Sequence, residues 1–169
     1  ELLAQEFPVW ISDINNLEDA YKMIIGLGRL TGPQASAWRL ISTVKFKWKD
    51  IPELPEIPTA YFIWRGPWMV AGGNTFIDDV MNWCGMNNVF RSADSRYPEV
   101  TAEDIVAANP QLILLSSEPY PFKEQHIAEL QALCPNAMIK LVDGEMFSWY
   151  GSRMREAAGY LDGLVKSLQ

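Results

Sequence analysis

From Thr59 to the end of the chain, short apolar runs alternate with amphipathic segments, and this alternation limits the possible folds more than any other feature. The runs at 60–64, 112–115 and 137–142 have the length of strands and are mostly apolar. Strands buried on both faces appear as continuous apolar runs, and parallel strands are joined by helices that cover the sheet. The sequence therefore predicts an α/β fold in which a mostly parallel sheet lies between two layers of helices.

The helices of this region are predicted from apolar spacing and from capping residues. Thr101 and Asp104 have the spacing of a capping box, in which each side chain binds a backbone N–H group at the start of a helix. Residues 85–88 include a glycine and two asparagines and are expected to form a turn. The predicted helices cover 75–84, 102–108, 122–133 and 152–168.

The first 58 residues have a different pattern. Residues 1–7 are expected to be the last turns of a helix, and Val9–Ile11 to form a short strand. Apolar spacing predicts a helix capped at residue 15 or 16 and a long second helix over 33–48. Residues 51–58 contain three prolines, which exclude regular structure, so this segment is expected to be a stiff connector and the domain boundary.

Composition excludes two classes of partner. The 169 residues carry a formal net charge of −7 at pH 7, and their 14 Lys and Arg residues form no block. Phosphate binding requires a clustered basic face, so nucleic acid is not an expected partner. No apolar run approaches the roughly 20 residues of a membrane-spanning helix, so the chain is not expected to span a membrane.

The reactive side chains indicate neither catalysis nor a metal site. Cys84 and Cys134 are expected to be buried thiols, since no Cys-x-x-Cys motif or Cys/His cluster is present. The single histidine, His126, has glutamate and glutamine neighbours on a predicted helix and is expected to face solvent. The sequence contains no Gly-x-Ser-x-Gly elbow, Walker loop or histidine dyad. It therefore predicts no catalytic residues, no metal ligands, no bound cofactor and no enzyme activity.

The main functional signal is a set of aromatic residues on loops that interrupt the apolar pattern. The stretch 60–73 runs from a strand through a Gly-Pro turn flanked by tryptophans, and further aromatic residues lie at Tyr97 and at 147–150. In an open α/β sheet, ligands bind at the carboxyl ends of the strands, and aromatic walls suit a large, flat ligand. The alternative is structural: the tryptophans of 60–73 belong to the core, and Tyr97 and Trp149 pack between loops.

Three motifs of this region resemble a known family. They are Thr75–Asp79 leading into Cys84-Gly85 and Asn88–Phe90, then Tyr97–Asp104, then Asn109–Ile113. In this order and spacing they are similar to the carboxyl-terminal lobe of the substrate-binding proteins of ABC importers for vitamin B12, iron siderophores and haem. The two lobes of those receptors are joined by one long helix. The resemblance implies a three-layer, Rossmann-like lobe at 59–169, the interlobe backbone helix and connector at 33–58, and a remnant of the amino-terminal lobe at 1–32.

The resemblance also implies binding and docking residues. In that family the loop after the first strand, the aromatic residue before the proline of the extended segment, and the loop before the last helix line the ligand site. An acidic residue on the short capped helix docks on arginines of the membrane permease, and Glu103 has that position. A glutamate there also suits the helix dipole. The implied ligand-binding residues are Trp64, Arg65, Trp68, Met69, Tyr97, Glu145, Phe147 and Trp149.

The expected ligand is a corrinoid such as cobalamin, because the cleft loops are rich in aromatic and poor in basic residues, whereas ferric siderophores are usually anionic. Haem stays open, since Tyr97, Tyr120 or Tyr150 can ligate iron. The resemblance thus implies an extracytoplasmic receptor, periplasmic or lipid-anchored, that delivers a metal chelate to an ABC permease. Two other classes stay open: a small α/β enzyme with an aromatic pocket, and a structural interaction domain without a ligand.

Overall fold

The computed structural model describes residues 2–169 and contains one mixed sheet. The strands are β1 (Ile57–Trp64), β2 (Trp68–Val70), β3 (Met86–Asn88), β4 (Glu99–Val100), β5 (Leu112–Ser116) and β6 (Met138–Val142). Their order is β4-β2-β1-β5-β6, with β3 also paired to β1. The pairs β1–β3, β1–β5 and β5–β6 are parallel, whereas β2 is antiparallel to both β1 and β4. The predicted α/β fold with a mostly parallel sheet is confirmed.

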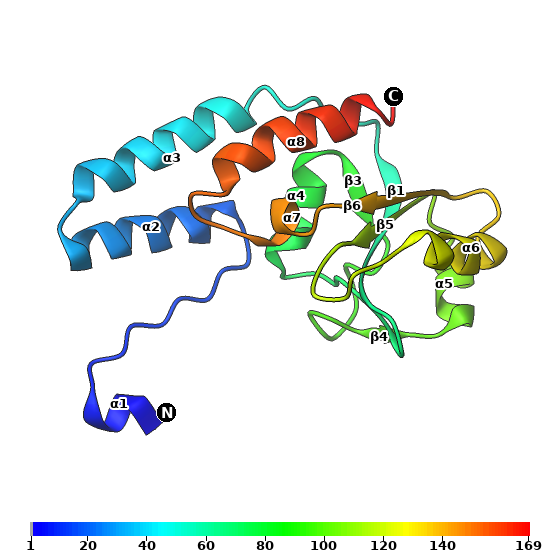
Figure 1. The fold of residues 1–169 in the computed structure, drawn as a ribbon, viewed down its shortest axis with the longest axis horizontal. Coiled ribbons are helices and arrows are strands. Elements are labelled where there is room, and N and C mark those ends of the chain that lie inside the picture. The colour runs from blue at the N-terminus through cyan, green and yellow to red at the C-terminus, as the bar shows by residue number, and fades with distance from the viewer. Residues whose placement is uncertain (1) are drawn as a thin grey trace.

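Helices cover both faces of this sheet (Figure 1). The helices are α1 (Leu2–Glu6), α2 (Leu17–Thr31), α3 (Gln34–Trp48), α4 (Phe76–Trp83), α5 (Ala102–Ala108), α6 (Glu124–Leu133), α7 (Glu145–Ser148) and α8 (Met154–Lys166). Successive side chains of a strand point to opposite faces, so Tyr61 joins the core shared with α4, α7 and α8. Its neighbour Phe62 joins the core shared with α5 and α6. The result is the expected three-layer arrangement.

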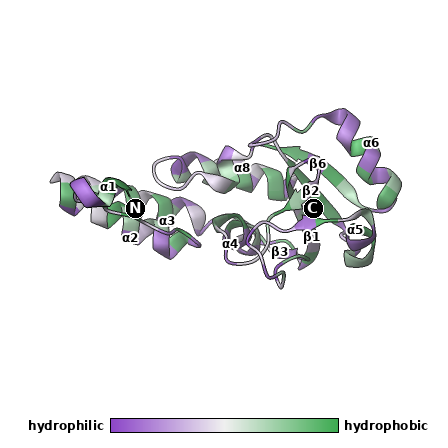
Figure 2. Cartoon of the chain, turned by 90° about the horizontal axis from the view of Figure 1, so that it is seen from below, coloured by the Kyte–Doolittle hydropathy of each residue, from purple (hydrophilic) through white to green (hydrophobic). Residues whose placement is uncertain are grey.

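The helices α2 and α3 form an antiparallel pair beside the sheet, as Figure 1 shows. A Cβ atom at Gly28 would lie 2.7 Å from the Cβ of Ala37, so the close approach of the two helices requires glycine there. The indole Nε1 of Trp48 donates to the carbonyl of Met154 at 2.7 Å and thereby ties α3 to α8. Figure 2 shows apolar residues concentrated in the strands of the sheet, with hydrophilic residues along the outer helices.

Several local predictions were wrong. Val9–Ile11 forms no strand and is exposed, because none of the strands in residues 2–169 pairs with it. Residues 86–88 form β3 instead of a turn, paired with the first residues of β1. β1 itself begins at Ile57, so the connector ends two residues earlier than expected, although Pro58 lies in the strand. The division of the chain at 32 and 58 stays a prediction.

Two predictions about helix starts had opposite outcomes. The capping box of α5 is confirmed: Thr101 N donates to Asp104 at 2.8 Å, and Asp104 N donates to the Thr101 hydroxyl at 3.2 Å. His126 was expected to face solvent, but it is buried at the start of α6. Its polar sequence neighbours lie outside, whereas its ring packs on Tyr120 and Phe122.

The predicted burial of Cys84 and Cys134 is confirmed.

Candidate functional site

The site is built from the loops that leave the carboxyl ends of β1, β5 and β6. These strands are parallel, so their carboxyl ends lie at one edge of the sheet. The β1–β2 turn, the loop 117–123 and the segment 143–151 follow them directly. In open α/β sheets this edge is where ligands bind.

The first group of side chains lies where the β1–β2 turn meets α6. Arg65 Nε is paired with Glu129 at 2.9 Å, and its guanidinium lies 4.5 Å from the ring centroid of Trp68. Trp64 is 40% exposed and contacts the edge of Tyr120, with ring centroids 5.6 Å apart. Trp64 therefore presents an aromatic surface, and the charge of Arg65 is already partnered.

Trp68 and Met69 differ from the expectation that they lie on a loop between a strand and a helix. Both belong to β2, because the chain turns back after Arg65 and pairs with β1. The Trp68 ring lies parallel to Phe122 at 6.2 Å and edge-on to Phe62 at 5.4 Å. Both Trp68 and Met69 are half-buried. In this position Trp68 mainly packs the second core.

The second group follows β6. Trp149 is 50% exposed, and its indole Nε1 donates to Glu118 at 2.6 Å. Arg153 lies 5.7 Å from the Trp149 ring centroid and is paired with Glu145 and Glu156. Its hydrogen bonds to Glu156 and then Glu145 raise the pKa of Arg153 above its ordinary value. In this second group, an exposed tryptophan ring therefore lies beside an arginine whose charge is paired with carboxylates.

Phe147 is placed differently from its neighbours. The side chain is fully buried and packs on Tyr61, with ring centroids 5.0 Å apart. Burial raises the pKa of the Tyr61 hydroxyl well above its usual value. Phe147 therefore anchors α7 to the sheet, and its position does not support the prediction that it touches a ligand.

Tyr97 lies on the loop that precedes β4 and is 40% exposed. Two close approaches fix this loop: a Cβ at Gly72 would lie 2.5 Å from the Ser95 carbonyl, and one at Gly73 would lie 2.3 Å from that of Arg91. Gly72 N also donates to the carbonyl of Arg96 at 2.9 Å. The backbone therefore holds Tyr97 in place, without a side-chain contact to either tryptophan group among the described residues.

The loop 117–123 joins the two groups, but the sequence interpretation did not include it among the ligand-binding loops and named its Tyr120 only as a possible haem ligand. Glu118 binds Trp149, and Tyr120 contacts Trp64. The signal was present, since this loop follows a buried strand as the other two do, and its Tyr120 lies between two prolines. Glu103, on α5, is exposed as expected for a docking residue, and nothing in the structure tests that role.

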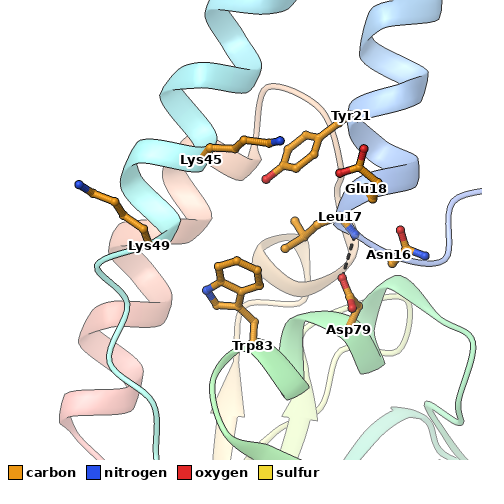
Figure 3. Close-up of a pocket in the computed structure, with 8 residues that line it drawn as sticks. All are labelled: Asn16, Leu17, Glu18, Tyr21, Lys45, Lys49, Asp79 and Trp83. Carbon is orange, nitrogen blue, oxygen red and sulfur yellow. Dashed lines mark hydrogen bonds between the residues drawn. The ribbon is translucent and has the colours of Figure 1, made fainter.

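A separate pocket of about 510 Å³ lies between α2, α3 and α4 (Figure 3). Several of its polar groups already have partners within the chain. Lys45 lies over the ring of Tyr21, Asp79 accepts from the backbone N–H of Leu17 at 2.8 Å, and Trp83 donates to the carbonyl of Trp48. We therefore interpret this pocket as the joint between the helix pair and the sheet.

Residues 2–169 contain no group of three or more His, Cys, Asp or Glu side chains placed to hold a metal ion. None of their helices combines the length and hydrophobicity needed to cross a bilayer.

Comparison with known proteins identifies the family. The sequence pattern of a family described as periplasmic binding protein matches residues 1–133. Among curated proteins, none matches the chain.

Solved structures share the fold at low sequence identity. A possible iron-binding periplasmic solute-binding protein from Staphylococcus epidermidis has a TM-score of 0.77 and 19% identity over 99% of this chain and 68% of its own. The periplasmic vitamin B12 binding protein of Vibrio cholerae has a TM-score of 0.71 and 17% identity, covering 98% and 68%. The periplasmic haem binding protein of the same organism has a TM-score of 0.76 and 16% identity, covering 97% and 70%. All three structures are named as binding proteins. With the family match over residues 1–133, the chain belongs to the periplasmic binding protein family.

Proposed function

We propose that this chain serves an extracytoplasmic receptor that captures a corrinoid, most simply cobalamin, and delivers it to an ABC import permease. The observation that carries the choice of ligand is that Arg65 and Arg153 are paired with carboxylates at a sheet edge that also exposes Trp64 and Trp149. Arg65 and Arg153 both bind carboxylates, while Trp64 and Trp149 keep 40% and 50% of their surface exposed.

The remaining arginines of the neighbouring loop follow the same pattern. Arg91 is paired with Asp78 at 3.2 Å and Arg96 with Asp13 at 3.1 Å. An anionic siderophore or the two carboxylates of haem would have to compete with these intramolecular partners. A corrinoid presents a broad, partly apolar face and uncharged amide groups, which suit aromatic walls and single hydrogen bonds.

The relatives named above support the ligand class and not the choice within it, because receptors for iron, vitamin B12 and haem all share the fold. Ferric siderophore and haem are therefore the alternatives. The permease partner and the periplasmic or lipid-anchored location are part of the proposal and rest on membership of the family.

The test is a calorimetric screen of the full-length protein against cyanocobalamin, haem and a ferric siderophore. The proposal expects saturable binding of cyanocobalamin with a stoichiometry near one. Saturable binding of haem or siderophore without binding of cyanocobalamin would replace the ligand and keep the receptor. Turnover of a chelate by the protein alone would favour the enzyme alternative instead.

A further inference from the structure

The ring of His126 is held in one tautomer. Its Nδ1 accepts a hydrogen bond from the backbone N–H of Lys123 at 2.9 Å, so Nδ1 carries a lone pair. A neutral imidazole then carries its proton on Nε2. The ring is only 3% exposed, which shields this arrangement from exchange with water.

The proton on Nε2 is directed to Tyr120. The Tyr120 hydroxyl oxygen lies 3.1 Å from Nε2. The amide nitrogen of Gln125 lies at 3.3 Å, but it is a donor and does not accept this proton. Because Nε2–H donates, the Tyr120 oxygen accepts, and the proton of that hydroxyl needs another acceptor. Residues 2–169 provide none within hydrogen-bonding distance. The hydroxyl therefore keeps one donor unused.

Tyr120 is also fixed in position. Its ring contacts Phe122 at 4.9 Å, His126 at 5.4 Å and Trp64 at 5.6 Å between centroids, each edge-on or nearly so. Trp64 is the exposed member of this cluster, at the carboxyl end of β1. An oriented donor thus lies beside an exposed indole at the ligand-binding edge.

We infer that Tyr120 and Trp64 form one subsite, in which the indole covers an apolar part of the chelate and the Tyr120 hydroxyl donates to a carbonyl oxygen on its rim. His126 is the positioning residue for that hydroxyl. This inference rests on the proposed function, because amide carbonyls are the acceptors that a corrinoid rim presents. It assigns roles to Tyr120, which the sequence interpretation named only as a possible haem ligand, and to His126, which it placed outside the site.

The positioning role is tested without ligand. The chain contains one histidine, so a nitrogen-15 NMR spectrum of the full-length protein labelled at histidine assigns residue 126 directly, provided that any further histidine is replaced. The Nε2–H tautomer is expected, and Tyr120→Phe should shift the Nε2 resonance while Nδ1 stays an acceptor. An Nδ1–H tautomer, or a resonance that does not respond to Tyr120→Phe, would overturn the positioning role.

The binding role is tested by calorimetry of the full-length protein with cyanocobalamin. Tyr120→Phe removes only the hydroxyl and should weaken affinity roughly 5- to 10-fold, the net effect of one hydrogen bond. His126→Asn keeps an acceptor near Nδ1 but loses the donor, so it should match Tyr120→Phe. His126→Gln keeps a donor near Nε2 and should retain affinity even where its stability falls. Glu124→Gln, at an exposed position of the same helix, is the matched control and should bind as the wild type does.

The outcomes separate this inference from the proposed function. Unchanged affinity of Tyr120→Phe, with cyanocobalamin bound by the wild type, overturns the subsite and leaves the receptor intact. If the wild type binds haem or the ferric siderophore in place of cyanocobalamin, the same variants are measured with that chelate, and an unchanged affinity again overturns the subsite. Binding of none of the three contradicts both proposals.

Discussion

The indole Nε1 of Trp149 donates a hydrogen bond to Oε1 of Glu118 at 2.6 Å, although the two residues are 31 positions apart. The same oxygen accepts from the Ser148 hydroxyl at 3.0 Å. Glu118 therefore joins the loop after β5 to the segment after β6. An aromatic face fixed in this way loses less conformational freedom when a ligand binds than a mobile one does.

Removing this contact should weaken ligand binding without changing the ligand-facing atoms. Glu118→Ala frees Trp149, and we expect a several-fold lower affinity for cyanocobalamin that arises from faster dissociation. Glu118→Gln keeps an oxygen acceptor for the indole and is the matched control. Stopped-flow dissociation rates measure the effect, and equal rates for Glu118→Ala and wild type would show that the contact is irrelevant to binding.

Trp68 and Trp149 should respond to truncation in opposite ways. Trp68 packs between Phe62 and Phe122, so Trp68→Ala should lower the free energy of unfolding by about 2–4 kcal/mol through lost packing and cavity formation. Trp149→Ala removes a half-exposed ring and should mainly reduce affinity. Denaturant unfolding and calorimetry on both variants separate the two effects. A stable Trp68→Ala protein that no longer binds ligand would restore Trp68 to the site.

The sequence was sufficient for the elements whose local chemistry decides their structure. The run 112–115 is apolar enough to require burial, and the spacing of Thr101 and Asp104 specifies a capping box that the structure contains. The positions of the loops at the carboxyl edge followed from strand order, which is why Trp64 and Trp149 were expected at the same edge of the sheet.

The remaining differences arise from contacts between distant residues. His126 has polar neighbours in sequence, but Tyr120 and Lys123 satisfy both ring nitrogens and allow burial. The local sequence does not show that Phe147 is buried, because its packing partner Tyr61 comes from a distant strand. Residues 86–88 were predicted to be a turn because three residues are too few to show the alternation of a strand. They form a strand only because they pair with the first residues of β1.

The buried thiols provide a test of the core that is independent of ligand. Burial raises the pKa of Cys84 from its ordinary value near 9 to about 12, and burial also raises the pKa of Cys134. The thiolate is the reactive form, so neither cysteine should react with a disulfide reagent at pH 8 until the chain unfolds. Rapid labelling of Cys84 in the native protein would contradict its place in the core.

The same pKa shift predicts a loss of stability at high pH. The folded-state pKa of Cys84 lies above the unfolded value, so the unfolded chain releases this proton first as pH rises. The contribution of Cys84 is therefore complete below about pH 8.5 and declines as pH rises toward 12. Denaturant unfolding of wild type and Cys84→Ala between pH 8 and 11 should show a steeper decline for wild type; parallel curves would exclude the effect.

Glu103 should serve the permease and not the ligand. It is exposed on α5, while Asp104 forms the capping box, so Glu103→Gln should leave folding and ligand affinity unchanged. Transport in vesicles reconstituted with the permease should fall, with the largest difference from wild type at low salt, where charge pairs are least screened. Glu124→Gln, on α6, is the control. Reduced ligand affinity with normal transport per bound ligand would place Glu103 in the cleft.

The most direct test of corrinoid capture is a competition by equilibrium dialysis. The full-length protein is dialysed against equal concentrations of cyanocobalamin, haem and an anionic ferric siderophore, and the retained chelate is identified by its absorption spectrum. Because the arginines at the edge that exposes Trp64 and Trp149 are paired with carboxylates, we expect cyanocobalamin to be retained at one molecule per protein. Retention of haem or the siderophore, with cyanocobalamin equal on both sides of the membrane, would contradict corrinoid capture.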